Sequence, residues 1–521
     1  MKACCARYAA SLVAPSTAAR TANLFSRPRA PIVFQVLGRR PMSSSPIRYA
    51  EMPKELPGDD PDDVLFNSLY GVRTIELNRP KKLNSLNGSM VRKIMPRLRE
   101  WEKSQMANVI MITGAGPKAF CAGGDVAELA QQNKDGPEGQ KKSADYFALE
   151  YQLDHMIATY SKPYVAVLDG ITMGGGVGLS VHAPFRIATE KTVFAMPETT
   201  IGFFPDVGGS FFLSRLDGEI GTYLALTSER LHGVQAFYAG VATHYVDSSV
   251  LPQLTTRLAE LVFKDYATLT ERLQLINSTI AEFTNNLPSP DAYEASKHGN
   301  LSGKLREAID RTFKYDTVED ILSALRKESE SGDEYLSEWA RQTAKTIALR
   351  SPTSLRVTLR ELREGANWNI SEAFIREHRM AAKFMEHPDF VEGVSARLIN
   401  KPPTKPEWKP ANLTEVSNED VDEFFKMPPG FEAMTLLEPH EGALDQQFTD
   451  YPHAVFALPR ESDIEKVVRS YGRQGAKAVI NEVAKKWNHK AGVREKVQEV
   501  IARKTRTDGG GISWKGQTPN L

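Results

Sequence analysis

Two glycine-rich turns are the part of this sequence best suited to hold a reacting group. The first is AFCAGGD (119–125), and the second is the triple glycine at 174–176. Glycine lets a backbone approach a ligand closely and leaves its amide groups accessible. Two amides that come from separate loops can stabilise the oxygen of a tetrahedral intermediate. The two turns together therefore predict an oxyanion hole, whereas either one alone could be an ordinary tight turn.

Two isolated carboxylates follow the second turn. Glu198 and Asp206 lie among largely apolar residues in FAMPETTIGFFPDVGG (194–209). Carboxylates in apolar surroundings have raised pKa values and suit acid–base or nucleophilic work. Backbone donors combined with such carboxylates are what acyl-thioester chemistry requires.

Other kinds of site are disfavoured. GAGPKA (114–119) loosely matches a dinucleotide-binding fingerprint, but the residues after it do not open a convincing helix. The sequence has no Walker A motif, and GLSVH (178–182) is not the GxSxG of serine hydrolases, so His182 is expected to be a packed helix residue. Only Cys121 lies beyond the first 45 residues, which excludes a zinc cluster of cysteines.

Short apolar runs separated by helical patterns must position these residues. Strands are predicted at 74–77, 109–113, 164–168, 185–188 and 193–195. A helix is predicted at 86–103, between the first two strands. This alternation favours parallel βα units and an α/β fold. From 250 to 398 the pattern is almost wholly helical, with a capped amphipathic helix in SPTSLRVTLRELREG (351–365).

Both ends of the chain are basic. Residues 1–50 contain no Asp or Glu and are rich in Arg, Ser and Ala, which is typical of a mitochondrial transit peptide. Segment 464–506 holds twelve Lys or Arg and four Glu residues among interleaved apolar ones. Such a face can dock on a protein or on an RNA backbone, or it can belong to a small helical hairpin with a solvated surface. No apolar run reaches the roughly 18 residues of a membrane span, so no membrane partner is expected.

Several segments resemble the crotonase superfamily of acyl-CoA enzymes. They are NRPKKLN (78–84), KAFCAGGD (118–125), KPYVAVLDGITMGGGVGLS (162–180) and FAMPETTIGFFPDVGG. Within the superfamily they are most similar to the 3-hydroxyisobutyryl-CoA hydrolase branch, the mitochondrial thioesterases of valine breakdown. The resemblance runs from about 64 to 415. It implies a ββα spiral core that is followed by a helical C-terminal region.

The resemblance also implies catalytic roles. Gly124 and Gly175 match the amides of the oxyanion hole. Glu198 matches the second superfamily glutamate, and Asp206 matches the aspartate of the hydrolase branch. Gly178 stands where hydratases of the superfamily carry a catalytic glutamate. Its lack of a carboxylate favours hydrolysis over hydration.

Substrate contacts follow from the same resemblance. Glu150 matches a glutamate that binds the hydroxyl of the acyl group, and the alternative for it is a solvated helix carboxylate. Lys82 and Ala122 fall in the segments that hold the CoA portion. CoA is part of the substrate, so no separate cofactor is implied. Whether Glu198 attacks the thioester or activates a water is left open by the sequence.

The predicted organisation combines an enzyme with two extensions. A transit peptide (1–45) and a linker (46–63) precede a crotonase-like core (64–250), a helical part of the hydrolase (251–415), a second linker (416–463) and a basic helical tail (464–521). The predicted function is hydrolysis of 3-hydroxyisobutyryl-CoA, together with 3-hydroxypropionyl-CoA, in the mitochondrial matrix. Long-tailed fungal members of the family resemble this layout and are associated with the small subunit of the mitochondrial ribosome. The alternative is therefore a structural component of that subunit, bound to it or to its rRNA through the tail, with or without hydrolase activity.

Overall fold

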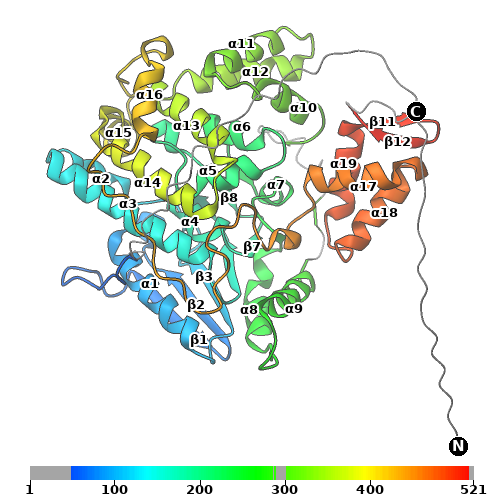
Figure 1. Cartoon of the computed structure of the whole chain (residues 1–521), viewed down its shortest axis with the longest axis horizontal. Helices are drawn as coiled ribbons and strands as arrows, with labels where there is room; N and C mark the ends of the chain where they lie inside the picture. Colours follow the sequence, from blue (N-terminus) through cyan, green and yellow to red (C-terminus); the bar gives the residue numbers. More distant parts are fainter. Residues whose placement is uncertain (1–48, 285–286, 289–300, 516–521) are drawn as a thin grey trace, which may run out of the picture. The chain divides into compact units, whose positions relative to one another are not determined.

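The apolar strand β5 (Tyr164–Leu168) lies near the middle of a six-stranded sheet (Figure 1). All five of its side chains are buried, as expected for a strand covered on both faces. The strand order is β1-β2-β3-β5-β7-β10, and only β1 runs antiparallel to its neighbour. The other strands are β1 (Val64–Leu69), β2 (Val72–Leu77), β3 (Val109–Gly114), β7 (Phe185–Ala188) and β10 (His244–Tyr245). This computed structural model describes residues 49–284, 287–288 and 301–515, so the expected transit peptide at 1–45 lies outside the described residues.

A smaller sheet carries the candidate site. Its order is β4-β6-β8-β9, in which only β9 is antiparallel to its neighbour. The strands are β4 (Ala119–Cys121), β6 (Ile171–Met173), β8 (Val193–Ala195) and β9 (Leu231–His232). The first glycine turn follows β4, the triple glycine follows β6, and Glu198 follows β8. Because parallel strands end at the same edge of a sheet, these three motifs meet there.

The α/β prediction is confirmed, and so are the five predicted strands, within one or two residues of their ends. The predicted helix at 86–103 is α1 (Gly88–Lys103), where the side chain of Asn87 accepts a hydrogen bond from the amide of Met90. The predicted capped helix is α13 (Pro352–Gly365). Its cap is Ser351, whose hydroxyl accepts from the amide of Ser354 at 3.1 Å.

Helices surround the two sheets and make up most of the chain after 250, as predicted (Figure 1). The helices between the strands are α2 (Val126–Asn133), α3 (Pro137–Ala158), α4 (Gly175–Val181), α5 (Gly209–Phe212), α6 (Ile220–Thr227) and α7 (Val234–Tyr238). Those that follow are α8 (Leu251–Ala259), α9 (Leu269–Ala281), α10 (Gly303–Thr312), α11 (Val318–Glu328), α12 (Glu334–Ile347), α14 (Ile370–Glu386), α15 (Pro388–Val394) and α16 (Asn418–Phe425). Helix α14 packs along α3, and their contact includes the rings of Tyr151 and Phe374.

The last part of the described chain, residues 461–515, is called here the C-terminal module. It consists of α17 (Glu461–Tyr471), α18 (Ala476–Lys486), α19 (Val493–Lys504) and a hairpin of β11 (Thr505–Asp508) and β12 (Gly511–Trp514). The predicted helices are present, whereas the hairpin stands where the sequence pattern indicated only a polar end. Figure 1 shows these elements gathered in orange and red. Their apolar residues, among them Val467, Val483 and Val500, are buried in a core that also contains Phe237 of the body.

Residues 426–460 connect α16 to the module as a mostly irregular segment that lies against the body. The amide of Leu444 donates to the carbonyl of Thr159 at 3.0 Å. Further along, Phe448 and Tyr451 pack on the ring of Phe211. Prolines and weak periodicity in the sequence identify the irregular backbone but do not reveal these contacts.

Candidate active site

The amide of Gly124 is directed away from its own loop. Leu86 bridges this loop: its amide donates to the carbonyl of Gly123, and its carbonyl accepts from the amide of Asp125, both at 2.8 Å. In such a parallel bridge, the amide and carbonyl of the middle residue point to the opposite side. The Gly124 N–H therefore faces the other glycine turn.

The second amide belongs to Gly175, the first residue of α4. A Cβ at Gly175 would lie only 2.3 Å from Oε1 of Glu150 and 3.3 Å from the nitrogen of Gly124. Only glycine fits this position, and the two turns lie side by side because it does. Within the described parts of the chain, neither amide donates to a protein acceptor. The two N–H groups form a pair of free donors, as an oxyanion hole requires.

A cavity of about 300 Å³ opens in front of these donors. Six of the seven residues predicted for the site line it: Ala122, Gly124, Glu150, Gly175, Glu198 and Asp206. The rest of the wall is mainly apolar and includes Val126, Phe147 and Phe203. The structure thus brings together residues from four separate segments of the sequence. A small acyl group fits such a pocket, which is apolar except for a few converging polar groups.

The three carboxylates of the cavity have raised pKa values. Burial raises the pKa of Glu198 well above its usual range, and repulsion from Asp206 raises it further. Burial and then the charge of Asp206 do the same to the pKa of Glu150. Burial raises the pKa of Asp206 to about 7, against a hydrogen bond from Tyr151 that lowers it. The cavity therefore holds groups suited to exchange protons near neutral pH.

Asp206 is held in place by residues that the sequence did not reveal. The hydroxyl of Tyr151 donates to Oδ2 of Asp206 at 2.7 Å. Glu377, on α14, accepts hydrogen bonds from the amides of Gly208 and Ser210 at 2.7 and 3.0 Å. These bonds fix the turn after Asp206. Nothing in the sequence around Glu377 could have identified it, because it lies about 170 residues further along the chain.

His182 supports the same turn and is packed, as predicted. It is fully buried, and its Nε2 lies 2.8 Å from the carbonyl oxygen of Val207. A carbonyl oxygen only accepts, so Nε2 carries the proton and the other ring nitrogen is an acceptor. The hydroxyl of Tyr451 donates to this Nδ1 at 2.8 Å. His182 therefore has both nitrogens engaged in structure and is not available as a base.

Lys82 is the one predicted site residue that does not line the cavity. Its side chain is 59% exposed and pairs with Asp125 at 2.8 Å, beside the bond from Arg79 to the same carboxylate oxygen. Lys82 thus lies on the outer side of the Gly124 turn. Among the described residues, no group of His, Cys, Asp or Glu side chains is placed to hold a metal ion, and no helix is long and apolar enough to cross a membrane.

The sequence model of the enoyl-CoA hydratase/isomerase family matches residues 72–425. The chain belongs to this family, the crotonases. A solved crotonase structure, a carnitinyl-CoA dehydratase from Mycobacterium thermoresistibile, is 34% identical and superposes with a TM-score of 0.60 over 71% of this chain and 98% of that one. The crotonase fold predicted for the core is thereby confirmed.

Two kinds of named crotonase relative are similar to this chain. The small ribosomal subunit protein mS47 of Neurospora crassa is 52% identical over 478 residues, which cover 91% of each chain. The mitochondrial 3-hydroxyisobutyryl-CoA hydrolase of Gallus gallus is 45% identical over 368 residues, which cover 71% of this chain and 90% of that protein. A second mS47, from Schizosaccharomyces pombe, is 43% identical over 382 residues, 73% of this chain and 84% of that protein.

Position 178 is closed to a side chain. At Gly178 a Cβ would lie 2.4 Å from Oδ2 of Asp154, one turn after Glu150 on α3. Asp154 is fully buried, and neither of its carboxylate oxygens has a partner in the described structure. The space that a side chain at 178 would need is therefore filled from the neighbouring helix. A hydratase-type glutamate cannot occupy position 178 unless Asp154 moves.

Proposed function

We propose that this protein is a component of the mitochondrial small ribosomal subunit that retains a working acyl-CoA hydrolase site. The sequence alone favours hydrolysis as the main function and the ribosome as the alternative; the comparisons favour the alternative. The observation that carries the proposal is the length of the match to mS47. It spans 478 residues, so it must extend beyond residue 425, where the family model ends. Residues 1–45 would act as the transit peptide that brings the chain into the matrix.

The C-terminal module offers a surface for ribosomal RNA. Several of its basic residues pair with acids of the body, such as Lys496 with Asp217 at 2.8 Å, and these are not available to a partner. Others remain exposed. Lys477 and Lys485 lie on one face of α18 with Asn481 between them, and Asn481 accepts a hydrogen bond from Arg494 of α19 at 3.0 Å.

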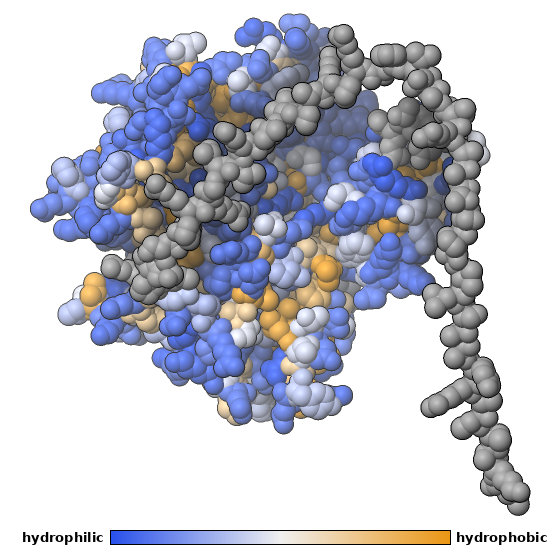
Figure 2. All heavy atoms as spheres, viewed as in Figure 1, coloured by the Kyte–Doolittle hydropathy of each residue, from blue (hydrophilic) through white to orange (hydrophobic). Residues whose placement is uncertain are grey.

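We call Lys477, Lys485 and Arg494 the basic ridge. None of the three pairs with a carboxylate in the described part of the chain. Figure 2 shows mainly hydrophilic residues, with scattered hydrophobic ones, over the visible part of the module. A phosphate backbone suits such a ridge better than an apolar protein surface does.

The retained site supports hydrolysis of a small β-hydroxyacyl thioester. The thioester oxygen would accept hydrogen bonds from the amides of Gly124 and Gly175, which stabilise the oxyanion by about 3–4 kcal/mol for each donor. Glu198 then either attacks the carbonyl to give a mixed anhydride, which water hydrolyses, or removes a proton from the attacking water. In both routes the sulfur leaves with a proton as free CoA. Asp206 and Glu150 would orient the water and the acyl hydroxyl.

A panel of acyl-CoA substrates tests the enzymatic half of the proposal. We expect release of free CoA from 3-hydroxyisobutyryl-CoA and 3-hydroxypropionyl-CoA, and no hydration of crotonyl-CoA because Gly178 lacks a carboxylate. Isobutyryl-CoA is 3-hydroxyisobutyryl-CoA without its hydroxyl group. It should be a poorer substrate, because the buried carboxylates that bind the hydroxyl would be left without a partner. No CoA release from either hydroxyacyl substrate would show that the site is a structural remnant.

Sedimentation tests the ribosomal half without disturbing the fold. Deleting the module would expose its apolar core, so three charge reversals on the basic ridge, Lys477→Glu, Lys485→Glu and Arg494→Glu, are preferable. We expect the wild-type chain to co-migrate with small subunits from a mitochondrial lysate and to dissociate as salt rises, and we expect the triple variant to remain in light fractions.

The matched control reverses three exposed lysines of the body, Lys134, Lys264 and Lys345, and should leave co-migration intact. A triple ridge variant that still co-migrates would rule out electrostatic attachment through the ridge. A wild-type chain that never co-migrates would contradict the ribosomal role itself.

A further inference from the structure

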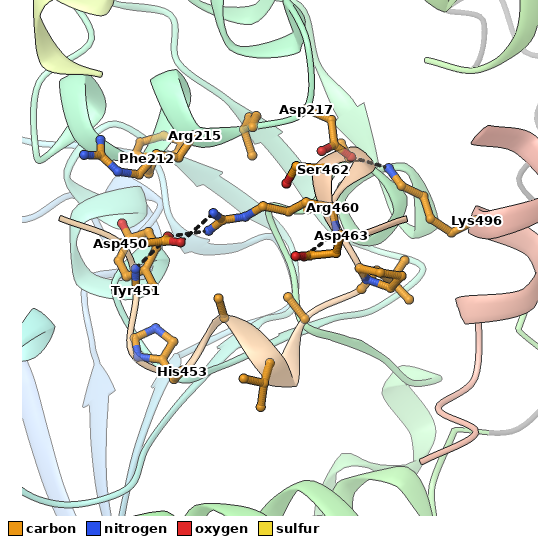
Figure 3. A pocket seen from close by; sticks show the side chains of 18 of the residues that line it. Phe212, Arg215, Asp217, Asp450, Tyr451, His453, Arg460, Ser462, Asp463 and Lys496 are labelled. Carbon is orange, nitrogen blue, oxygen red and sulfur yellow. Dashed lines mark hydrogen bonds and ion pairs between the residues drawn. The ribbon is translucent and has the colours of Figure 1, made fainter. Parts of the chain in front are cut away.

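A second cavity, of about 310 Å³, lies between the body, the segment 450–460 and α17 (Figure 3). It shares no lining residue with the acyl-CoA cavity. Its walls come from the crotonase core and, more than 200 residues further along the chain, from the irregular segment and the C-terminal module that follows it. The hydrolysis proposed for the acyl-CoA cavity does not involve this second cavity, and the names of the related proteins assign it no role.

The cavity contains more positive than negative charge. Five basic and three acidic side chains line it. Each acid has a basic partner: Arg460 donates twice to Asp450, Lys496 pairs with Asp217, and Lys466 pairs with Asp463. Figure 3 shows the first two of these pairs on either side of the cavity.

The two remaining cations are Arg186 and Arg215. Arg186 is buried, and its guanidinium donates to the backbone carbonyls of Val241 and Ala183 at 2.6 and 2.7 Å. The hydrogen bonds of Arg215 go to backbone carbonyls and to the hydroxyl of Ser214. Among the described residues no carboxylate forms an ion pair with either of them. Arg186 is buried and Arg215 is partly buried, and buried cations are normally paired, so this excess of positive charge calls for a negative partner.

His453 provides an independent sign of a missing partner. Its side chain is only 3% exposed, yet neither ring nitrogen has a hydrogen-bond partner in the described structure. Burial lowers the pKa of His453 well below its usual value, so the ring is neutral and offers one donor and one acceptor. In Figure 3 it lies on the same side of the cavity as Asp450 and Tyr451. A buried polar ring with no partner is rare in a native protein and indicates a group that would complete it.

We propose that this cavity binds a small organic molecule that carries a carboxylate or a phosphate. The negative group would balance the unpaired charge of Arg186 and Arg215, and a hydroxyl or carbonyl of the ligand would meet His453. An organic body is needed because the cavity is larger than a bare oxyanion and part of its wall is apolar, including Leu216, Leu458 and Trp487. A ligand there would touch both the body and α17, and would therefore stabilise the attachment of the module.

Calorimetric titration of the full-length chain tests the site with three probes. These are adenosine monophosphate for the phosphate source, valerate for the carboxylate source, and valeramide as the neutral analogue of valerate. We expect at least one anion to bind with a Kd below about 1 mM and the amide to bind at least tenfold more weakly. The anion that binds identifies the source of the negative group.

Variants separate this cavity from the acyl-CoA site. Lys466→Glu reverses an exposed charge at the cavity and should weaken the anion by about tenfold or more, because one attraction becomes a repulsion. His453→Ala should also weaken it. Lys345→Glu, an exposed reversal on α12 that does not line the cavity, should leave the Kd unchanged. The proposal is overturned if neither anion binds below about 1 mM, or if binding ignores both cavity variants.

Discussion

At the scale of single residues, the fold treats Glu198 and Asp206 differently although both are buried. Asp206 receives a hydrogen bond from Tyr151, whereas Oε2 of Glu198 has no partner in the described structure. Once both groups are ionised, the carboxylate oxygen without a hydrogen-bond donor is the more reactive of the two. Glu198 is therefore the better candidate for the group that attacks or deprotonates, and Asp206 for the group that orients.

Substitution of Glu198 by Gln tests this assignment. Glutamine keeps the shape of the side chain but is neither a base nor an effective nucleophile, so we expect turnover of 3-hydroxyisobutyryl-CoA to fall by about 10³-fold. The Kd for the substrate should change little, because the oxyanion donors and Glu150 remain. Stopped-flow release of CoA and equilibrium binding measure the two quantities. Glu100→Gln, at an exposed position of α1, is the control; wild-type turnover by Glu198→Gln would refute the role of Glu198.

The residues that line the candidate site could be predicted largely from sequence because they cluster in short motifs. Glycine pairs and isolated carboxylates keep their spacing whatever surrounds them. Lys82 also belongs to a motif, but its side chain pairs with Asp125. The residues next to Lys82 in the sequence do not show that its side chain turns toward Asp125. Tyr151 and Glu377 could not be found, because their contacts with the Asp206 turn depend on how α3 and α14 pack against it.

At the scale of elements, the packing of α3 on α4 determines which side chains can stand beside the candidate site. Glu150 and Asp154 lie one turn apart on α3 and face Gly175 and Gly178 of α4. Burial raises the pKa of Asp154 well above its usual range, and the charge of Glu150 adds to the rise. The crossing of the two helices thus excludes a side chain at Gly178 and keeps a second buried carboxyl beside Glu150.

A double-mutant cycle at this crossing gives the second prediction. Gly178→Ala should lower the free energy of unfolding by about 1–3 kcal/mol, because its Cβ would overlap Asp154. In an Asp154→Ala background the carboxylate is gone, so the same substitution should cost much less. Denaturant unfolding of the four proteins measures the coupling. Gly58→Ala, where a Cβ meets nothing within 4 Å, is the control. Equal costs in both backgrounds would contradict the proposed packing.

Helices and strands could be predicted from the sequence where their apolar residues recur at regular spacing. They could not be predicted where that spacing is irregular. The strands and α13 have regular apolar patterns. Helix α3, the longest in the described chain at 22 residues, was missed because its buried face carries polar residues such as Ser143, Glu150, Asp154 and His155. The segment 426–460 lacks any period, yet Tyr451 within it reaches through His182 to the turn after Asp206.

At the scale of the whole molecule, buried carboxyls from four elements surround the site. Helix α3 and the turns after β8 contribute the carboxyls described above. Helix α13 adds Glu361, and helix α14 adds Glu377. Burial raises the pKa of Glu377 to about 8, against the hydrogen bonds of Ser210 and Gly208. Glu361 is fully buried with both oxygens unpartnered in the described structure. Burial raises its pKa well above the ordinary value, and the charges of Glu377 and Asp206 add to the rise.

Such a set of raised pKa values makes the stability of the whole fold depend on pH. In the unfolded chain Glu361 titrates near 4.5, while in the folded chain it keeps its proton to much higher pH. The folded state therefore binds more protons over the interval between these two values. Each such carboxyl lowers the free energy of unfolding by up to about 1.4 kcal/mol per pH unit as the pH rises through that interval. The contribution of these carboxyls is therefore larger in mild acid than in mild alkali, whereas buried histidines such as His182 and His453, whose pKa values burial lowers, act in the opposite direction.

Glu361→Gln should reduce this loss, because glutamine fills the same space and has no proton to release. We expect the variant to lose less stability than the wild type between about pH 5 and pH 9, with the largest advantage at the alkaline end. Urea unfolding at several pH values measures the slopes. Glu364→Gln, three residues along α13 and partly exposed in a pair with Arg360, should retain the wild-type slope. Parallel curves of unfolding free energy against pH for Glu361→Gln and the wild type would show that Glu361 is not protonated in the folded chain. In that case a cation or solvent would have to lie beside Glu361, where α13 packs against the carboxyls of the site.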